Sequence, residues 1–314
     1  MEYRTKVIVL SCAAAALALA YALGVAFDPA RRGARADAYA WLDPRDADRI
    51  YSIAISAAGG ADPVVLLRAP GGGWVVAGEG GARYPARQAR VGDFVAELSR
   101  RAPFPVRATS AAAHERLSLG EADAARVTAA GAAGPPLLDL LIGRQSGRNA
   151  YMRRAGRGEV RSGEDRFSHY VQAGRGSWYN LMFFPENDGG LFSIQDVARV
   201  SAYPPGGAAP MVFTRSGRAW AAGFEIAALN SLRVDAFVRD IMLSSGESFA
   251  SGEGAAFGDS RLALEFADGT SAEISFTAPD ENGRRLASVS GGLAYVVTGW
   301  MHDRLFPPPE TFGL

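Results

Sequence analysis

The residues whose type and spacing most favour chemistry are the arginines between positions 144 and 175. On a β-hairpin alternate side chains share one face, so arginines in this segment would form a basic stripe. A guanidinium binds carboxylate and phosphate groups, and such a stripe would meet an anionic glycan, lipid headgroups or an acidic partner. The segment holds eight arginines and three acidic residues, and the contacts predicted from it are Arg148, Arg153, Arg154, Arg157 and Arg161.

The alternative interpretation of this segment is a set of solvated strand faces in a chain that uses arginine throughout. Lys6 is the only lysine, and alanine and glycine are abundant, which is typical of a GC-rich genome. Basic and acidic residues number 33 each. This balance leaves no overall charge that would favour a nucleic acid as a partner.

Other residue types offer no recognisable catalytic, metal or cofactor motif. The glycines at 71–73 and 143–147 lack the lysine of a phosphate-binding loop, and they predict hairpin turns instead. His114, His169 and His302 lack the paired spacing of a metal site. Cys12 is the only cysteine, so no disulfide can form within the chain. We therefore predict no catalytic residue, metal or cofactor. An envelope hydrolase stays an alternative, because two catalytic carboxylates from distant positions leave no motif.

The N-terminal segment predicts a membrane anchor. Residues 7–27 carry no charge, and about 20 apolar residues cross the hydrocarbon core of a bilayer. Residues 1–6 would form a short cytoplasmic end and residues 28–44 a tether. A cleavable signal peptide is the alternative, because Ala18-Leu19-Ala20 has the small residues of a cleavage site. Three arginines between positions 31 and 35 oppose the positive-inside preference, but a long C-terminal domain crosses regardless of such charges. We expect a single-pass protein of the bacterial inner membrane with its body outside the cytoplasm.

The rest of the chain is predicted to form two related α+β units, residues 45–190 and 191–314. Each has one clear amphipathic helix, in which apolar residues recur at i, i+3, i+4 and i+7. These residues are Val91, Phe94, Val95 and Leu98 in the first unit, and Val234, Phe237, Val238 and Ile241 in the second. Before each helix, strand-like runs meet a glycine turn and a tryptophan, Trp74 or Trp220, which predicts antiparallel hairpins.

Each unit is expected to follow the order β-β-β-α-β-β-β-α, as antiparallel sheet covered by amphipathic helices. After the helix, residues 137–143 and residues 261–269 would be corresponding strands. The alanine-rich stretch from Thr109 to Gly134 predicts either a small extra helix or an irregular excursion of the first unit. The join between the units is expected near Pro185 to Gly190.

Several short motifs follow the N-terminal segment in an order shared with one bacterial family. They are residues 49–56, Gly73-Trp74-Val75-Val76, Tyr84-Pro85-Ala86, the Val91/Phe94 helix, the strand ending at Gly143, Tyr151-Met152-Arg153, and residues 178–184 leading into Arg199-Val200. Over most of residues 1–245 the chain resembles the family catalogued as domain of unknown function 4340. The resemblance implies a single-pass envelope protein associated with ABC-type export systems, such as those linked to gliding motility. It supplies no catalytic or ligand-binding residues.

Together these observations predict a non-enzymatic, membrane-anchored accessory or scaffolding subunit of an envelope complex. The resemblance implies that this complex is an ABC-type transporter. The expected partners are the membrane, through the N-terminal helix, and an integral-membrane protein, with no nucleic acid and no small-molecule ligand. The main alternative is a binding module for an anionic envelope polymer, which would use the arginine-rich segment 144–175.

Overall fold

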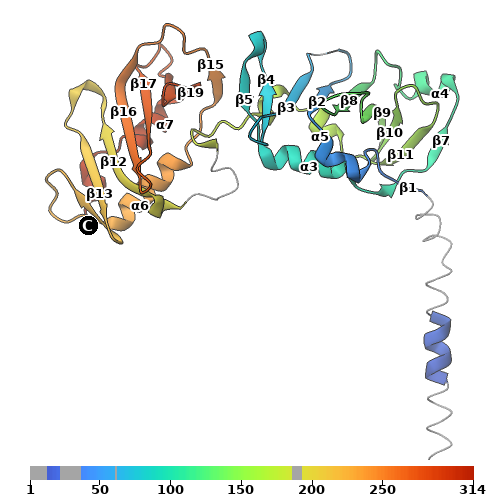
Figure 1. Cartoon of the computed structure of the whole chain (residues 1–314), viewed down its shortest axis with the longest axis horizontal. Coiled ribbons are helices and arrows are strands. Elements are labelled where there is room, and N and C mark those ends of the chain that lie inside the picture. The colour runs from blue at the N-terminus through green and yellow to red at the C-terminus, as the bar shows by residue number, and fades with distance from the viewer. Residues whose placement is uncertain (1–12, 22–36, 61, 186–192) are drawn as a thin grey trace, which may run out of the picture. The chain divides into compact units, whose positions relative to one another are not determined.

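The computed structural model describes residues 13–21, 37–60, 62–185 and 193–314 (Figure 1). The chain divides into two compact units. Of the described residues, those within 1–72 and 92–174 form the first unit, and those within 73–91 and 175–314 form the second. Both combine antiparallel sheet with a few helices, so the predicted α+β class is confirmed.

The sheet of the first unit runs in the order β3-β2-β8-β9-β10-β11-β7, with antiparallel neighbours. In β2, β3 and β8 buried side chains alternate with less buried ones, and in β2 the buried ones are Ile53 and Ile55. This period of two directs one face of the sheet towards a core. The strands are β2 (Ser52–Ser56), β3 (Val64–Arg68), β7 (Val106–Ala108), β8 (Ala125–Ala130), β9 (Leu138–Ser146), β10 (Asn149–Arg154) and β11 (Val160–Glu164).

The amphipathic helix predicted for the first half of the chain is α3 (Gln88–Ser99). Val91, Phe94 and Leu98 are fully buried, as their spacing predicted. Phe94 meets Tyr170 of the short helix α5 (Ser168–Val171), with the two ring centroids 4.8 Å apart. The apolar stripe of α3 is therefore confirmed as a core face.

The second unit contains an eight-stranded antiparallel sheet in the order β14-β13-β12-β16-β17-β18-β19-β15, and the hairpin formed by β4 (Trp74–Ala77) and β5 (Arg83–Pro85). The predicted helix is α6 (Ser231–Met242), and its stripe shares one buried cluster with sheet residues such as Phe213 and Leu262. The Asn230 side chain caps α6 by accepting from the main-chain N–H groups of Leu232 and Arg233. The remaining elements are β12 (Val197–Tyr203), β13 (Met211–Ser216), β14 (Ala219–Ala222), β15 (Ser248–Ala250), β16 (Phe257–Phe266), β17 (Ser271–Thr277), β18 (Arg285–Val289), β19 (Ala294–Val297) and α7 (Gly299–Leu305).

The alanine-rich stretch between Thr109 and Gly134 contains both a short helix and a central strand. α4 (Ala111–Arg116) is the small helix that the sequence allowed, and β8 lies between β2 and β9. The pattern concealed β8 because its buried positions are only Val127 and Ala129, and alanine favours helix more than strand. Each sheet receives five strands after its long helix, so the prediction of three strands at this point is wrong.

Most of the predicted anchor lies outside the described residues. Residues 13–21 are helical, and no helix in the described part of the chain has the length and apolar character needed to span a membrane. The anchor, the end 1–6 and the part of the tether before residue 37 therefore stay predictions, whereas residues 38–42 of the predicted tether 28–44 contribute a paired strand and two buried side chains to the folded first unit. The predicted join also stays a prediction, because residues 186–192 lie outside the described ranges.

A short strand follows directly after the undescribed residues 22–36. β1 (Ala38–Tyr39) pairs antiparallel with β6 (Ala102–Pro103), with Tyr39 opposite Ala102. The chain then continues through Trp41 and Leu42, whose side chains are fully buried. We call residues 38–42 the strap, because they pair with β6, donate a hydrogen bond to Leu98 at the end of α3, and form one wall of the site described next.

Candidate functional site

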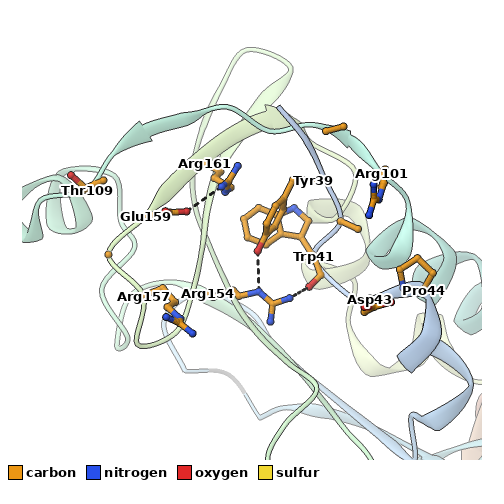
Figure 2. A pocket seen from close by; sticks show the side chains of 13 residues that line it. Tyr39, Trp41, Asp43, Pro44, Arg101, Thr109, Arg154, Arg157, Glu159 and Arg161 are labelled. Carbon is orange, nitrogen blue, oxygen red and sulfur yellow. Dashed lines mark hydrogen bonds and ion pairs between the residues drawn. The ribbon is translucent and has the colours of Figure 1, made fainter. Parts of the chain in front are cut away.

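The strap borders a pocket of about 790 Å³ in the first unit. Arginines supply most of the charge around it, and Figure 2 shows Arg154 and Arg157 on one side of the strap aromatics and Arg101 on the other. We call this site the arginine pocket. Its lining residues are Ala38, Tyr39, Ala40, Trp41, Asp43, Pro44, Arg101, Thr109, Arg154, Arg157, Gly158, Glu159 and Arg161.

The strap is fixed to the first unit by aromatic packing and by main-chain hydrogen bonds. The ring centroids of Tyr39 and Trp41 lie 5.0 Å apart, and those of Trp41 and Phe104 lie 5.5 Å apart, both edge to face. The main-chain N–H of Leu42 donates to the carbonyl oxygen of Leu98 at 2.9 Å. The indole Nε1 of Trp41 is buried and has no hydrogen-bond partner among the described residues.

Two of the predicted arginines, Arg154 and Arg161, hold the strap in place. Arg154 donates through Nε to the Tyr39 hydroxyl at 3.1 Å, and through Nη2 to the carbonyl oxygen of Trp41. The guanidinium of Arg161 lies 4.2 Å from the centroid of the Tyr39 ring and donates to the Phe104 carbonyl oxygen at 2.9 Å. A cation over an aromatic face is attracted by the ring quadrupole. Both arginines are therefore fixed in orientation on the wall of the pocket.

The structure places Arg153 inside the protein, so it does not belong to an exposed stripe. Its side chain is only 6% exposed and donates to the carbonyl oxygens of Leu119 at 2.9 Å and Arg157 at 3.3 Å. Arg153 lies opposite Leu141 across the β9–β10 pair, and opposite residues point to the same face. Leu141 packs in an apolar cluster with Leu119, so residues from the α4 segment cover this face. The alternation of side chains along a strand could not predict that a distant segment buries this face.

Arg157 and Arg101 are the exposed arginines of the pocket. Arg157 lies in the turn between β10 and β11, and Arg101 lies between α3 and β6. Neither side chain has a hydrogen-bond or ion-pair partner within the described ranges. Arg148, by contrast, is exposed between β9 and β10 and does not line the pocket. Three of the five predicted arginines therefore meet at one site, and Arg101 joins them from a distant part of the chain.

Two carboxylates line the pocket, and each already has a partner. Asp43 accepts from the main-chain N–H of Arg45 at 2.9 Å, and Glu159 accepts from Arg161 at 3.1 Å. Four arginines against two carboxylates leave a net lining charge of two positive units. Because Arg101 and Arg157 have nothing of opposite sign paired with them, the pocket favours an anion.

A second chemical arrangement, in the second unit, joins Ser260 and His302. The Ser260 Oγ lies 2.8 Å from His302 Nε2, and His302 Nδ1 lies 3.4 Å from an Asp303 carboxylate oxygen. Both Ser260 and His302 are almost fully buried, and this burial lowers the pKa of His302 and so favours its neutral imidazole. Neither residue lines the arginine pocket. A serine nucleophile must meet its substrate, so this buried pair is better explained as a satisfied polar contact in the core.

Metal binding finds no support in the described part of the chain. No group of three His, Cys, Asp or Glu side chains there could hold a metal ion. His114, which the sequence singled out, donates through Nε2 to the carbonyl oxygen of Gly158 at 2.9 Å. This hydrogen bond fixes the turn that carries Arg157.

No protein-family model, curated protein or solved structure matches the chain. The resemblance to domain of unknown function 4340 stays a prediction from the motifs that carry it.

Proposed function

We propose that the protein is a non-enzymatic, membrane-anchored and extracytoplasmic subunit of an envelope complex, and that its first unit binds an anionic envelope component. The anchor and the location come from the uncharged N-terminal segment. The binding role is supported by the arginine pocket. This proposal joins the two leading hypotheses from the sequence, an accessory subunit and a module for an anionic polymer.

The single observation that carries the binding role is the pair of unpaired guanidinium groups in the pocket. Arg101 and Arg157 approach the site from distant parts of the chain, and no described carboxylate neutralises either of them. Arginine presents five N–H donors in a rigid fork that suits carboxylate and phosphate. An anion bound between these arginines would remove an unfavourable concentration of positive charge.

Retention on immobilised anions tests this role. The detergent-solubilised full chain is applied to a polyuronate, to a polyglycerol phosphate and to phosphatidylglycerol, each on a solid support. We expect retention on at least one support, and loss of that retention in the double variant Arg101→Glu/Arg157→Glu. The matched control is Arg144→Glu/Arg148→Glu, because it changes the charge equally at exposed positions of the same unit outside the pocket.

The two double variants also separate the pocket from the basic stripe that the sequence predicted. If the control loses binding and the pocket variant keeps it, the stripe at the hairpin tip is the contact and the pocket is not. If no support retains the wild-type chain, the binding role is wrong. The folded state of both variants is checked by their thermal unfolding before the comparison is made.

We also propose that the two α+β units arose by duplication. Strand order supports this, because β3-β2-β8-β9-β10-β11-β7 in the first sheet corresponds position by position to β13-β12-β16-β17-β18-β19-β15 in the second. Along the chain, each long helix also comes at the same point. α3 follows β2, β3 and the strand β4 that begins with Trp74, and α6 follows β12, β13 and the strand β14 that contains Trp220. The correspondence pairs β8 with β16, and so replaces the sequence-based match of residues 137–143 with residues 261–269. An experimental structure in which β8 and β16 held different positions in their sheets would contradict a duplication.

For the accessory role we propose an integral-membrane partner, with an ABC-type transporter as the complex that the resemblance implies. In-cell crosslinking followed by pull-down of the full chain in detergent tests this. Recovery of a membrane protein crosslinked to the chain is expected. Recovery of the chain alone, with efficient crosslinking of a known complex in the same cells, would contradict the accessory role and leave the binding role to be judged by the retention experiment.

A further inference from the structure

We propose that the ligand of the arginine pocket is the phosphate group of an anionic membrane lipid, of the phosphatidylglycerol type. This inference rests on the proposed function and narrows it to one class of ligand. It follows from the charge of the pocket, from the donors left over there, and from the position of the pocket in the chain.

The charge and size of the pocket fit a phosphate carried on a headgroup. The lining carries two net positive charges, and the phosphodiester of a phosphatidylglycerol headgroup is an anion at neutral pH. The volume of about 790 Å³ is much larger than a bare anion requires and lies within the range of small-molecule sites. A headgroup of phosphate and glycerol would occupy more of this space than inorganic phosphate alone.

The N–H donors of the pocket arginines fall into two groups, those that already have partners in the protein and those that remain for a ligand. Arg154 spends Nε and Nη2 on the strap, and Arg161 spends Nη1 and Nη2 on Phe104 and Glu159. The forks of Arg101 and Arg157 remain for a ligand, on opposite sides of the strap aromatics (Figure 2). This arrangement suits a headgroup with oxygen atoms along its length better than one compact anion.

The turn that carries Arg157 is held in a defined conformation before any ligand binds. Arg153 donates to the Arg157 carbonyl oxygen at 3.3 Å, and His114 donates to the Gly158 carbonyl oxygen at 2.9 Å. The main-chain N–H of Arg157 itself donates to the Arg154 carbonyl oxygen at 3.1 Å. A binding group on a fixed turn loses less conformational entropy when its ligand binds. Arg153 and His114 are positioning residues for Arg157.

The place of the pocket in the chain favours a lipid over a polymer. One wall is the strap, and only eleven residue-to-residue steps lead from Phe27, the end of the predicted anchor, to Ala38. At about 3.6 Å per extended residue, that length allows a separation of at most about 40 Å. A shorter path brings the strap to the membrane surface, where the phosphates of the lipids are the most concentrated anions. The length of the tether therefore allows the pocket to reach the headgroups.

Hydrogen–deuterium exchange on the full chain in nanodiscs tests the inference. The discs contain phosphatidylcholine alone or phosphatidylcholine with phosphatidylglycerol, and the peptides that cover residues 37–44 and 154–161 report on the pocket. We expect slower exchange of these peptides when phosphatidylglycerol is present. In the neutral variant Arg101→Gln/Arg157→Gln the effect should need about tenfold more anionic lipid, or more, for each arginine removed. The variant Arg144→Gln/Arg148→Gln should behave as the wild type.

Three results would overturn the inference. If the control variant loses protection as fully as the pocket variant, the lipid attracts basic surface in general. If inorganic phosphate added to phosphatidylcholine discs protects the pocket as well as phosphatidylglycerol does, a free phosphate is the ligand. If a soluble polyuronate or polyglycerol phosphate protects it and the lipid does not, a polymer is the ligand. In the last two cases the proposed anion-binding function stands, whereas absence of protection by any anion contradicts both.

Discussion

Replacing Arg153 with methionine removes a buried guanidinium and keeps much of the apolar length of its side chain. The strongest of its hydrogen bonds is the one to the Leu119 carbonyl oxygen at 2.9 Å, and those to Arg157 and Arg154 are longer, at 3.3 and 3.5 Å. Hydrogen bonds from a charged group contribute about 1.5–3 kcal/mol, and a buried acceptor left without a donor costs about 1–3 kcal/mol. If the short hydrogen bond contributes fully and the two long ones contribute weakly, the free energy of unfolding should fall by about 3 kcal/mol.

Thermal unfolding of the full chain in detergent, followed by circular dichroism, measures this loss. A unit of this size loses about 2–4 °C in Tm per kcal/mol, so the variant should melt roughly 6–12 °C lower. The matched control is Arg148→Met, because Arg148 is exposed in the turn between β9 and β10, the strand that carries Arg153. Its change should stay within about 0.5 kcal/mol. Equal Tm values for the two variants would show that Arg153 is not buried as described. The predicted basic stripe on the exposed face of the hairpin would then be the better interpretation.

Three other predictions test the strap, a close approach and a buried histidine. Tyr39→Phe removes the acceptor for Arg154 Nε and should cost about 1 kcal/mol in denaturant unfolding; no change would mean that this hydrogen bond does not hold the strap. Gly163→Ala places a Cβ 2.3 Å from Phe104 Cδ1 and 2.7 Å from the Pro103 carbonyl oxygen, so it should destabilise by about 1–3 kcal/mol. The contrasting change Gly92→Ala, on the exposed side of α3 with nothing within 4 Å, should raise stability by about 0.5–1 kcal/mol, and equal effects of the two would refute the packing. Burial and, to a smaller extent, the charge of Arg285 lower the folded-state pKa of His302, although Asp303 and Asp259 act to raise it. The unfolded chain therefore binds a proton at this residue more readily than the folded chain does. The free energy of unfolding should then fall as the pH drops through about 6.5. His302→Gln should flatten that part of the curve, and an unchanged pH dependence would assign it to other groups.

The helices were the part of the fold most open to prediction. Val91, Phe94 and Leu98 in α3, and Val234, Phe237, Val238 and Ile241 in α6, are buried as their spacing required. A stripe of large apolar residues reports helix burial from local information alone. β8 has no such signal, because Val127 is the only large residue among its buried positions. Its place between β2 and β9 is decided by pairing partners far away in the sequence.

The candidate site was predictable only in part, for a related reason. Residue type identified the arginines of the β10–β11 region, and Arg154, Arg157 and Arg161 do meet at one pocket. Which face each arginine takes depends on the α4 segment, which buries Arg153, and on a register shift between Ala150 and Met152. The pairing of β1 with β6 brings the strap next to Arg101, which directly precedes β6. Each of these strands has only two residues, and so short a pairing leaves no pattern in the sequence.

The strap also has a mechanical consequence. If the chain is held at its N-terminal side, any pull on the body reaches residues 38–42 before it reaches the large sheets, because β1 is the first strand in the described chain. That load falls on two paired residues, on the buried side chains of Trp41 and Leu42, and on the grip of Arg154. A force large enough to peel the strap away would dismantle one wall of the arginine pocket while the sheets stayed folded. Tension along the tether and occupancy of the pocket are thus opposed, so a ligand that bridges the pocket would raise the force the strap withstands.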